Sequence, residues 1–243
     1  MTKPAPSAKP LFRAIKGKAR APEAIGLALG PVATTAPKAE RRAQDFYPTG
    51  EPEAIRGLLA RDGDRIRQSG SVWEPAAGDG AMVREIRAAG LHCVATDIVD
   101  RGCPRSSVAS FYDFDEPPAK AIITNPPYCE INARNGHGRW LRRTLAMPGW
   151  DYLALLLSWD WPAARANGLG DLLDAQPFTR AYLMRWKLDF TGEGSPPQRN
   201  AWFIWDRLDP RAMPGNAGGL TAPDFLMMDR RDGERLNQPG LGI

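Results

Sequence analysis

The sequence predicts an α/β fold with a mostly parallel, seven-stranded sheet and helices on both faces. Apolar segments of strand length alternate with segments of helical spacing, which is typical of a parallel sheet. The run Y-L-A-L-L-L-S at 152–158 is apolar throughout, as expected of a strand buried on both faces. A length of 243 residues, 43% of them hydrophobic, is sufficient for one such domain with a sizeable core.

Charge and composition together divide the chain into three regions. Residues 1–44 contain nine Lys or Arg and two Glu, a net charge of +7, which leaves −3 for the rest of the chain. This Pro- and Ala-rich arm has little periodicity and is expected to be disordered. It is either a solubilising tail or a nucleic-acid-binding arm that contacts phosphates. Residues 45–206 are the expected folded domain, and 207–243 a Gly/Pro-rich tail with few clear elements.

The first helices and strands form a strand–turn–helix unit. Residues 53–61 have apolar residues at helical spacing and predict a helix. A short apolar strand at 71–74 leads into a Gly/Ala-rich turn at 75–80. The helix predicted at 81–89 ends at Gly90, a residue favoured just after a helix.

Beyond this unit the alternation continues. A helix is predicted at 139–147, and the segment 159–173 is expected to hold another. The remaining strands are expected at 91–96, 106–110, 120–124, 152–158, 180–186 and 201–206. A Gly-, Ser- and Pro-rich loop at 187–200 separates the last two strands.

Cysteine and histidine usage excludes several classes of site. The three cysteines, Cys93, Cys103 and Cys129, form no C-x-x-C pair and are odd in number. This predicts a reducing, cytoplasmic location, no disulfide framework and no metal centre. A content of only two histidines argues against a His-based triad as the catalytic device. No apolar run approaches the ~20 residues that span a membrane, and the N-terminus lacks the apolar segment of a secretory signal.

The turn after the first strand reads E-P-A-A-G-D-G at 74–80. Gly78 and Gly80 permit positive φ and close approach of the backbone to a ligand. The segment lacks the full G-x-G-x-x-G spacing and the Gly-Lys-Ser/Thr of a phosphate loop. Glu74 and Asp79 would repel a diphosphate and suit a ligand that carries an ammonium or sulfonium. The alternative interpretation is a structural glycine turn.

Acidic residues also follow the next two strands. Asp97 ends the second strand, about twenty residues after the glycine turn, where an acid accepts hydrogen bonds from ribose hydroxyls. Asp113 is placed to accept from an adenine amino group, with Phe114 packing on the ring. Either acid alone is equally consistent with a solvated aspartate.

The fourth strand runs directly into T-N-P-P-Y at 124–128. The lone pair of an exocyclic amine is delocalised into its ring, and two acceptors aimed at its N–H bonds expose that pair. The Asn125 side-chain carbonyl and the Pro126 backbone carbonyl are such acceptors, and proline holds its carbonyl rigidly. Tyr128 offers an aromatic face for stacking a base. The motif thus suits in-line attack of the amine on a methyl sulfonium without a metal, the alternative being a proline-stiffened turn.

Together these motifs resemble those of class I S-adenosyl-L-methionine-dependent methyltransferases with a Rossmann-like fold, specifically the N6-adenine DNA methyltransferases and their compact, phage-type members. The resemblance covers 45–206, including F-Y-P-T-G-E-P at 46–52, which resembles a segment closing over the methionine part of the cofactor. It implies the catalytic residues Asn125, Pro126, Pro127 and Tyr128. It implies the cofactor-binding residues Tyr47, Thr49, Glu74, Ala76, Gly78, Asp79, Gly80, Asp97, Ile98, Asp113 and Phe114.

The acceptor is the least determined feature. There is no room for a large target-recognition domain, although DNA is the expected partner and RNA an alternative. N-P-P-Y enzymes also methylate RNA bases or a glutamine amide, and a non-catalytic nucleic-acid-binding subunit is a further alternative. The oligomeric state stays open. The candidate phosphate contacts are Arg134, Arg139, Arg142, Arg143, Lys187 and Arg199.

Overall fold

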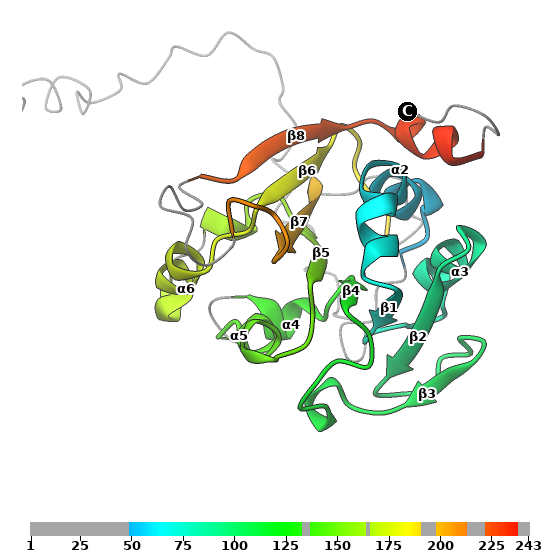
Figure 1. Ribbon diagram of the computed structural model, residues 1–243, viewed down its shortest axis with the longest axis horizontal. Coiled ribbons are helices and arrows are strands. Elements are labelled where there is room, and N and C mark those ends of the chain that lie inside the picture. The colour runs from blue at the N-terminus through cyan, green and yellow to red at the C-terminus, as the bar shows by residue number, and fades with distance from the viewer. Residues whose placement is uncertain (1–48, 133–136, 164–165, 191–197, 213–221, 238–243) are drawn as a thin grey trace, which may run out of the picture. The chain divides into compact units, whose positions relative to one another are not determined.

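The computed structural model describes residues 49–132, 137–163, 166–190, 198–212 and 222–237, which form one eight-stranded sheet (Figure 1). The strand order is β3-β2-β1-β4-β5-β7-β6-β8. Strand β7 is antiparallel to both of its neighbours, and every other pair is parallel. The strands are β1 (Ser71–Glu74), β2 (His92–Asp97), β3 (Ser106–Val108), β4 (Ala121–Thr124), β5 (Tyr152–Ser158), β6 (Arg180–Met184), β7 (Asn200–Asp206) and β8 (Asp224–Met228). The predicted α/β class and mostly parallel sheet are confirmed.

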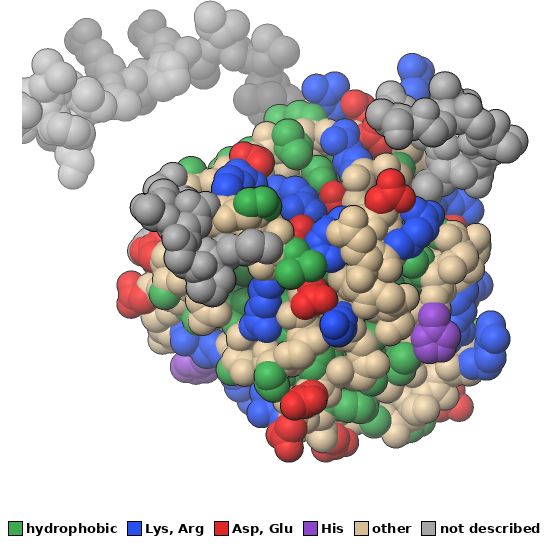
Figure 2. All heavy atoms as spheres, in the orientation of Figure 1, with side chains coloured by type: hydrophobic (Ala, Val, Ile, Leu, Met, Phe, Trp, Pro, Cys, Tyr) green, Lys and Arg blue, Asp and Glu red, His purple; other side chains and the backbone are tan. Residues whose placement is uncertain are grey.

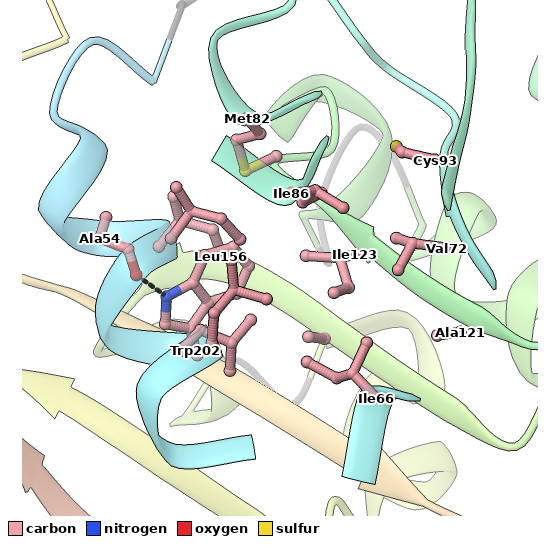
Figure 3. Packing of buried hydrophobic residues seen from close by; sticks show 14 of the residues in the cluster. Ala54, Ile66, Val72, Met82, Ile86, Cys93, Ala121, Ile123, Leu156 and Trp202 are labelled. Carbon is pink, nitrogen blue, oxygen red and sulfur yellow. Dashed lines mark hydrogen bonds between the residues drawn. The ribbon is translucent and has the colours of Figure 1, made fainter. Parts of the chain in front are cut away.

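Helices cover both faces of the sheet, as predicted. Strand β5 shows why: Ala154 and Leu156 pack into one apolar cluster with α2 and α3, whereas Leu153 and Leu155 pack into a second with α5 and α6. Figure 3 shows part of the first cluster, where the Trp202 indole donates a hydrogen bond to the Ala54 carbonyl at 2.9 Å. The α-helices are α2 (Pro52–Gln68), α3 (Ala81–Ala88), α4 (Tyr128–Ile131), α5 (Arg139–Ala146) and α6 (Leu169–Ala175). Short 3₁₀ turns are η2 (Phe111–Asp113), η3 (Trp161–Ala163), η4 (Ala166–Gly168) and η5 (Arg230–Asn237).

Three segments differ in detail from the sequence prediction. The helix expected at 53–61 continues to Gln68 as α2. The segment 159–173 holds the expected helix as α6, and η3 and η4 precede it because Pro162 and the positive φ of 53° at Asn167 interrupt helical geometry. The tail expected to have few elements contributes β8, which adds an eighth strand, and η5.

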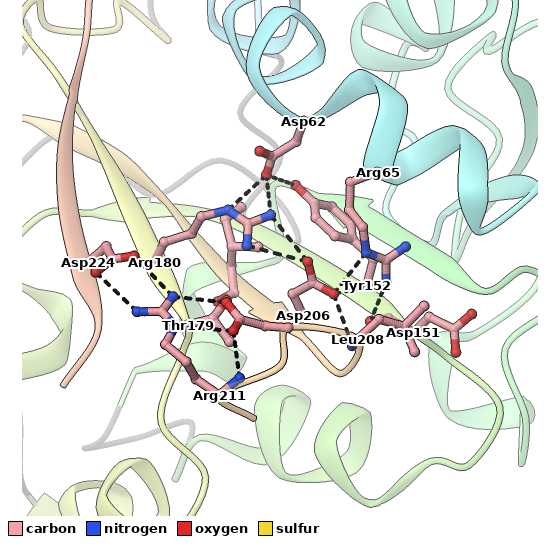
Figure 4. Close-up of polar contacts among 12 residues, drawn as sticks. Asp62, Arg65, Asp151, Tyr152, Thr179, Arg180, Asp206, Leu208, Arg211 and Asp224 are labelled. Carbon is pink, nitrogen blue, oxygen red and sulfur yellow. Dashed lines mark hydrogen bonds and ion pairs between the residues drawn. The ribbon is translucent and has the colours of Figure 1, made fainter. Parts of the chain in front are cut away.

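A buried polar network joins α2 to the sheet at the end where strand β5 begins (Figure 4). Asp62 of α2 accepts hydrogen bonds from the hydroxyls of Tyr152 and Tyr182, each at 2.7 Å, and from Arg180 at 2.8 Å. Arg180 also pairs with Asp206 at the end of β7. The unexpected length of α2 follows from this network, since Asp62 is a buried anchor rather than a surface residue that ends the helix.

The C-terminal elements pack on the same helix. Arg61 of α2 pairs with Asp232 of η5 at 2.7 Å and donates a second hydrogen bond to the Met227 carbonyl of β8. Strand β8 pairs in parallel with β6 at the outer edge of the sheet. Among the described residues no helix is long and apolar enough to cross a membrane.

Candidate active site

The three motifs meet at one edge of the sheet. Strands β2, β1 and β4 are parallel neighbours, so the segments that follow Glu74, Asp97 and Thr124 leave the sheet on the same side. The chain order reverses between β1 and β4, the point at which open α/β sheets bind ligands. The Gly78 amide donates to Asp97 Oδ2 at 2.8 Å, so the glycine turn and the acid after β2 are in direct contact.

The glycine turn has the backbone conformation expected of it. Gly78 and Gly80 have φ of 56° and 81°, a region that disfavours residues with a Cβ. A Cβ on Gly80 would lie 2.8 Å from the Sγ of Cys103, so the turn also excludes a side chain sterically. Asp79 Oδ1 accepts from the Ala81 amide at 3.0 Å. Asp79 therefore satisfies one amide in the first turn of α3.

Glu74 is the most electrostatically perturbed acid at this edge. Its side chain is fully buried, and Oε1 accepts from the Ala76 amide at 3.0 Å. Burial raises the pKa of Glu74 to about 8, and the negative charge of Asp97 adds to the rise. The Thr124 hydroxyl lies near enough to lower this pKa in part, yet neither Thr124 Oγ1 nor Glu74 Oε2 makes a hydrogen bond. Glu74 is thus largely protonated at neutral pH, beside a second unsatisfied polar atom.

The acid after β2 is already anchored. Asp97 is 9% exposed, and its Oδ1 accepts from the Val99 amide at 3.1 Å and lies 3.7 Å from Arg101 Nε. Ile98, which follows Asp97 in the chain, is 60% exposed. An exposed apolar side chain beside a rigid carboxylate is suited to contact with a nucleoside, which stays a prediction for both residues.

The D-F pair lies at the end of η2. Asp113 is exposed, and its Oδ2 accepts from the Ser110 amide at 3.0 Å, completing a capping box. Phe114 packs against Trp73 with ring centroids 4.9 Å apart. Arg143 of α5 donates to the Phe114 carbonyl at 2.6 Å and to Asp115 at 2.9 Å. These contacts fix the loop, and the adenine contact stays a prediction.

The N-P-P-Y segment joins β4 to α4. Asn125 Nδ2 donates to Thr49 Oγ1 at 3.2 Å, which brings the segment resembling a cofactor lid against the motif. Pro126 is buried, and Pro127 precedes the first residue of α4. Tyr128 is half-buried, and its hydroxyl donates to the Leu156 carbonyl and accepts from Asn200 Nδ2. Burial raises the pKa of Tyr128 well above its ordinary value, so the phenol stays neutral.

Two residues of this region were missed by the sequence reasoning. Asn200 opens β7, has no exposed surface and holds the Tyr128 hydroxyl. Glu51 binds Trp186, the Asp189 amide and Arg230. A polar residue opening the apolar strand A-W-F-I-W-D was the available signal for Asn200. Glu51 lies in the segment F-Y-P-T-G-E-P at 46–52, but nothing in that segment indicates its distant partners.

The candidate phosphate contacts differ in availability. Arg142 donates to the His137 and Asn167 carbonyls, and Arg143 is committed to the loop after η2. Arg139 is 60% exposed and lies 3.4 Å from Glu130. Lys187 and Arg199 are exposed at the carboxyl end of β6 and the start of β7.

Arg134 and the cofactor candidate Tyr47 lie outside the described residues. On the face in Figure 2, basic and acidic side chains are interspersed.

A pocket of about 370 Å³ lies at the opposite edge of the sheet. Trp150, Thr179, Asp206 and Arg207 line it, together with the start of the segment after β7. Arg207 stacks on Trp150, 3.5 Å from the ring centroid, and donates to the carbonyls of Trp150 and of Leu145 in α5. None of the motif residues lines this pocket, so we do not assign it to the candidate active site.

Comparison with known proteins gives only distant structural likeness. No protein-family model and no curated protein matches the chain. A type I restriction-modification methyltransferase subunit from Streptococcus thermophilus is 12% identical with a TM-score of 0.46, covering 70% of this chain and 47% of that subunit. The 23S rRNA methyltransferase ErmE is 18% identical with a TM-score of 0.45, covering 68% of this chain and 71% of ErmE. Because these scores are below 0.5, the fold assignment rests on the sheet topology itself.

Proposed function

We propose that this protein is an S-adenosyl-L-methionine-dependent methyltransferase that acts on the N6 amine of adenine in DNA. The observation that carries the proposal is the convergence of three motifs at one sheet edge. Asp97 contacts the Gly78 amide there, and Asn125 follows the adjacent strand at the point where the chain order reverses. This arrangement puts a nucleoside-type site beside an amine-gripping corner.

The residues at the edge fit the proposed cofactor. Gly78 and Gly80 hold the turn at positive φ without side chains, and Asp97 presents a rigid carboxylate. Glu74 Oε2 and Thr124 Oγ1 are buried without partners, as expected where a polar ligand completes the site. The cofactor would supply a methyl group on a cationic sulfur. Asp97, Ile98, Asp113 and Phe114 would hold its adenosine, and Thr49 and Glu74 would lie toward its amino-acid end.

The N-P-P-Y segment would orient the acceptor amine. Asn125 donates through Nδ2 to Thr49, which directs the opposite, carbonyl side of the amide away from that contact. The Pro126 ring fixes φ, and the following Pro127 restricts the ψ that sets the direction of the Pro126 carbonyl. Two acceptors placed in this way localise the nitrogen lone pair for attack. Tyr128, anchored through its hydroxyl, would offer its ring as a stacking surface for the base.

The acceptor class rests on charge. An adenine amine in DNA, the same amine in RNA and a glutamine amide all present a planar NH₂ group to this corner. The net charge of +7 in residues 1–44, together with the exposed Lys187 and Arg199, favours a polyanionic substrate. A non-catalytic nucleic-acid-binding subunit would share this charge but would not need the corner formed by Asn125 and Thr49.

The test is methyl transfer from labelled cofactor by the full chain to unmethylated duplex DNA, ribosomal RNA and release factor. We expect label on adenine N6 in DNA. We expect Asn125→Ala to lower turnover by about a hundredfold or more while cofactor binding, measured by calorimetry, is retained. Label on RNA or protein would overturn the DNA assignment alone. An active Asn125→Ala variant, or a wild-type chain that does not bind the cofactor, would overturn the mechanism.

A further inference from the structure

The side chain of Glu51 joins three parts of the chain: the segment before α2, the loop after β6 and the turn η5. The proposed mechanism gives this side chain no role. Its Oε1 accepts from the Asp189 amide at 2.9 Å. Its Oε2 accepts from the Trp186 indole at 3.1 Å and from Arg230 Nη2 at 2.7 Å. The loop after β6 and the C-terminal turn η5 are thereby tied to the residue that precedes α2.

This carboxylate is not needed by its own helix. Glu51 occupies the N-cap position of α2, where acidic side chains often accept a backbone amide, yet it makes no capping hydrogen bond. It is directed instead toward residues 135 to 179 positions away in the chain. The interaction therefore fixes where the segment before α2 lies, rather than whether α2 forms.

That segment carries Thr49, two residues before Glu51. Thr49 is 7% exposed and accepts from Asn125 Nδ2 at 3.2 Å. The orientation of an asparagine amide matters at this corner. An amide rotated by half a turn would present its NH₂ group to the NH₂ group of the acceptor, and two donors cannot bond to each other. In the structure the Thr49 hydroxyl is the acceptor in this contact, so the Asn125 amide lies with its carbonyl oxygen on the side away from Thr49.

We propose that Thr49 is a positioning residue that orients the Asn125 amide, and that Glu51 anchors Thr49 by binding Trp186, Asp189 and Arg230. The proposal rests on the proposed function, because it takes Asn125 as the group that accepts from the substrate amine. It gives the C-terminal segment a part in catalysis without any contact between that segment and substrate.

The first test separates positioning from binding. Thr49→Val keeps the shape of the side chain but removes the acceptor. We expect kcat to fall about tenfold, the equivalent of one hydrogen bond, and the dissociation constant of the cofactor, toward whose amino-acid end Thr49 would also lie, to change by less. Thr49→Ser, which keeps the hydroxyl, should restore most of the kcat. Thr179→Val is the matched control, because Thr179 is equally buried but donates to the Ile204 carbonyl at the opposite edge.

The second test concerns Glu51. We expect Glu51→Gln to lower kcat and to have no further effect in the Thr49→Val background, because both changes act on Asn125. Glu85→Gln is its control, since the Glu85 side chain is 18% exposed, like that of Glu51, and also pairs with an arginine, but lies on α3. Thermal unfolding verifies that each variant is folded.

The outcomes distinguish this inference from the proposed function. Wild-type kcat in Thr49→Val, a loss confined to cofactor affinity, or a full additional loss in the double variant would each overturn the positioning role. If Asn125→Ala is inactive in the same assay, the proposed function survives that result. If Asn125→Ala is active, the function itself fails.

Discussion

The Tyr128 hydroxyl accepts a hydrogen bond from Asn200 Nδ2 at 3.2 Å, which joins the N-P-P-Y segment to β7 across 72 positions of sequence. Asn200 has no exposed surface, and its Nδ2 also lies 3.4 Å from the Leu157 carbonyl. Its Oδ1 is buried without a partner, which carries a free-energy cost. Asn200 Nδ2 therefore bonds the Leu157 carbonyl within the sheet as well as the Tyr128 hydroxyl, and the second contact is the one that reaches the N-P-P-Y segment.

We therefore expect Asn200→Leu to loosen the Tyr128 ring while leaving the fold intact. Removing the unsatisfied Oδ1 should offset the absence of the hydrogen bond, so the free energy of unfolding should change by less than about 1 kcal/mol. Turnover should fall up to about tenfold. Tyr128→Phe should lower turnover at least as far, because it removes this bond and also the one that the hydroxyl donates to the Leu156 carbonyl. A double-mutant cycle on kcat measures the coupling. Independent, multiplying effects would show that the two residues act separately.

The elements that sequence reasoning located well are those defined by local pattern. The continuous apolar run at 152–158 predicted β5 to the residue, and the glycine turn placed the start of α3. The order of motifs after parallel strands predicted that they would share one edge. These features depend on periodicity and on glycine conformation, which are properties of a few adjacent residues.

What sequence reasoning missed depends on distant partners. The end of α2 was placed too early because Asp62 looks like a surface residue until Tyr152, Tyr182 and Arg180 are brought to it by the fold. Strand β8 is short and mostly exposed, and it exists because β6 provides an edge for it. Glu51 likewise gains its role only from partners far along the chain.

The Asp62 network yields a stability prediction that is separate from activity. Asp62→Asn removes the charge that Arg180 and two tyrosine hydroxyls share, and breaking a buried ion pair on one side typically costs about 3–5 kcal/mol. Because Arg180 keeps Asp206 as a partner, we expect a destabilisation of about 2–4 kcal/mol in urea denaturation. Cofactor affinity should be unchanged, since the network lies at the edge where β5 begins.

Asp64→Asn is the matched control for Asp62→Asn. Asp64 lies on the same helix, its side chain is 96% exposed, and it pairs across the surface with Arg67. Exposed pairs of this kind contribute about 0–1 kcal/mol, so a small effect is expected. Equal destabilisation in the two variants would mean that burial of Asp62 has no energetic importance.

Glu74 predicts a pH dependence of stability whose sign follows from its raised pKa. The folded chain holds the Glu74 proton up to about pH 8, whereas a glutamate in the unfolded chain releases it near the ordinary pKa of 4.5. Between these values the native state binds more protons than the unfolded state, so this contribution to stability is lost as pH rises. The slope is at most about 1.4 kcal/mol per pH unit.

The Glu74→Gln variant should flatten this dependence because glutamine does not titrate. Urea denaturation at several pH values between about 5 and 9 measures the difference in slope between wild type and variant. The variant should be the more stable of the two at the alkaline end, where the wild type must bury a charged carboxylate. Parallel curves for the two proteins would show that Glu74 is ionised in the native state throughout.

The basic arm gives the last prediction, which rests on sequence because residues 1–44 lie outside the described part of the chain. Deleting residues 1–40 removes most of the positive charge that favours nucleic acid. For every phosphate that the arm neutralises, its deletion should reduce the slope of log K against log salt by about 0.9. We therefore expect weaker DNA binding and a shallower salt dependence, measured by titration from low to physiological salt. Cofactor affinity serves as the internal control, because the cofactor is not a polyanion and its proposed site lies within the folded domain. If the salt slope of the shortened chain equals that of the full chain, the arm is a solubilising tail and the DNA contacts must come from exposed residues such as Lys187 and Arg199.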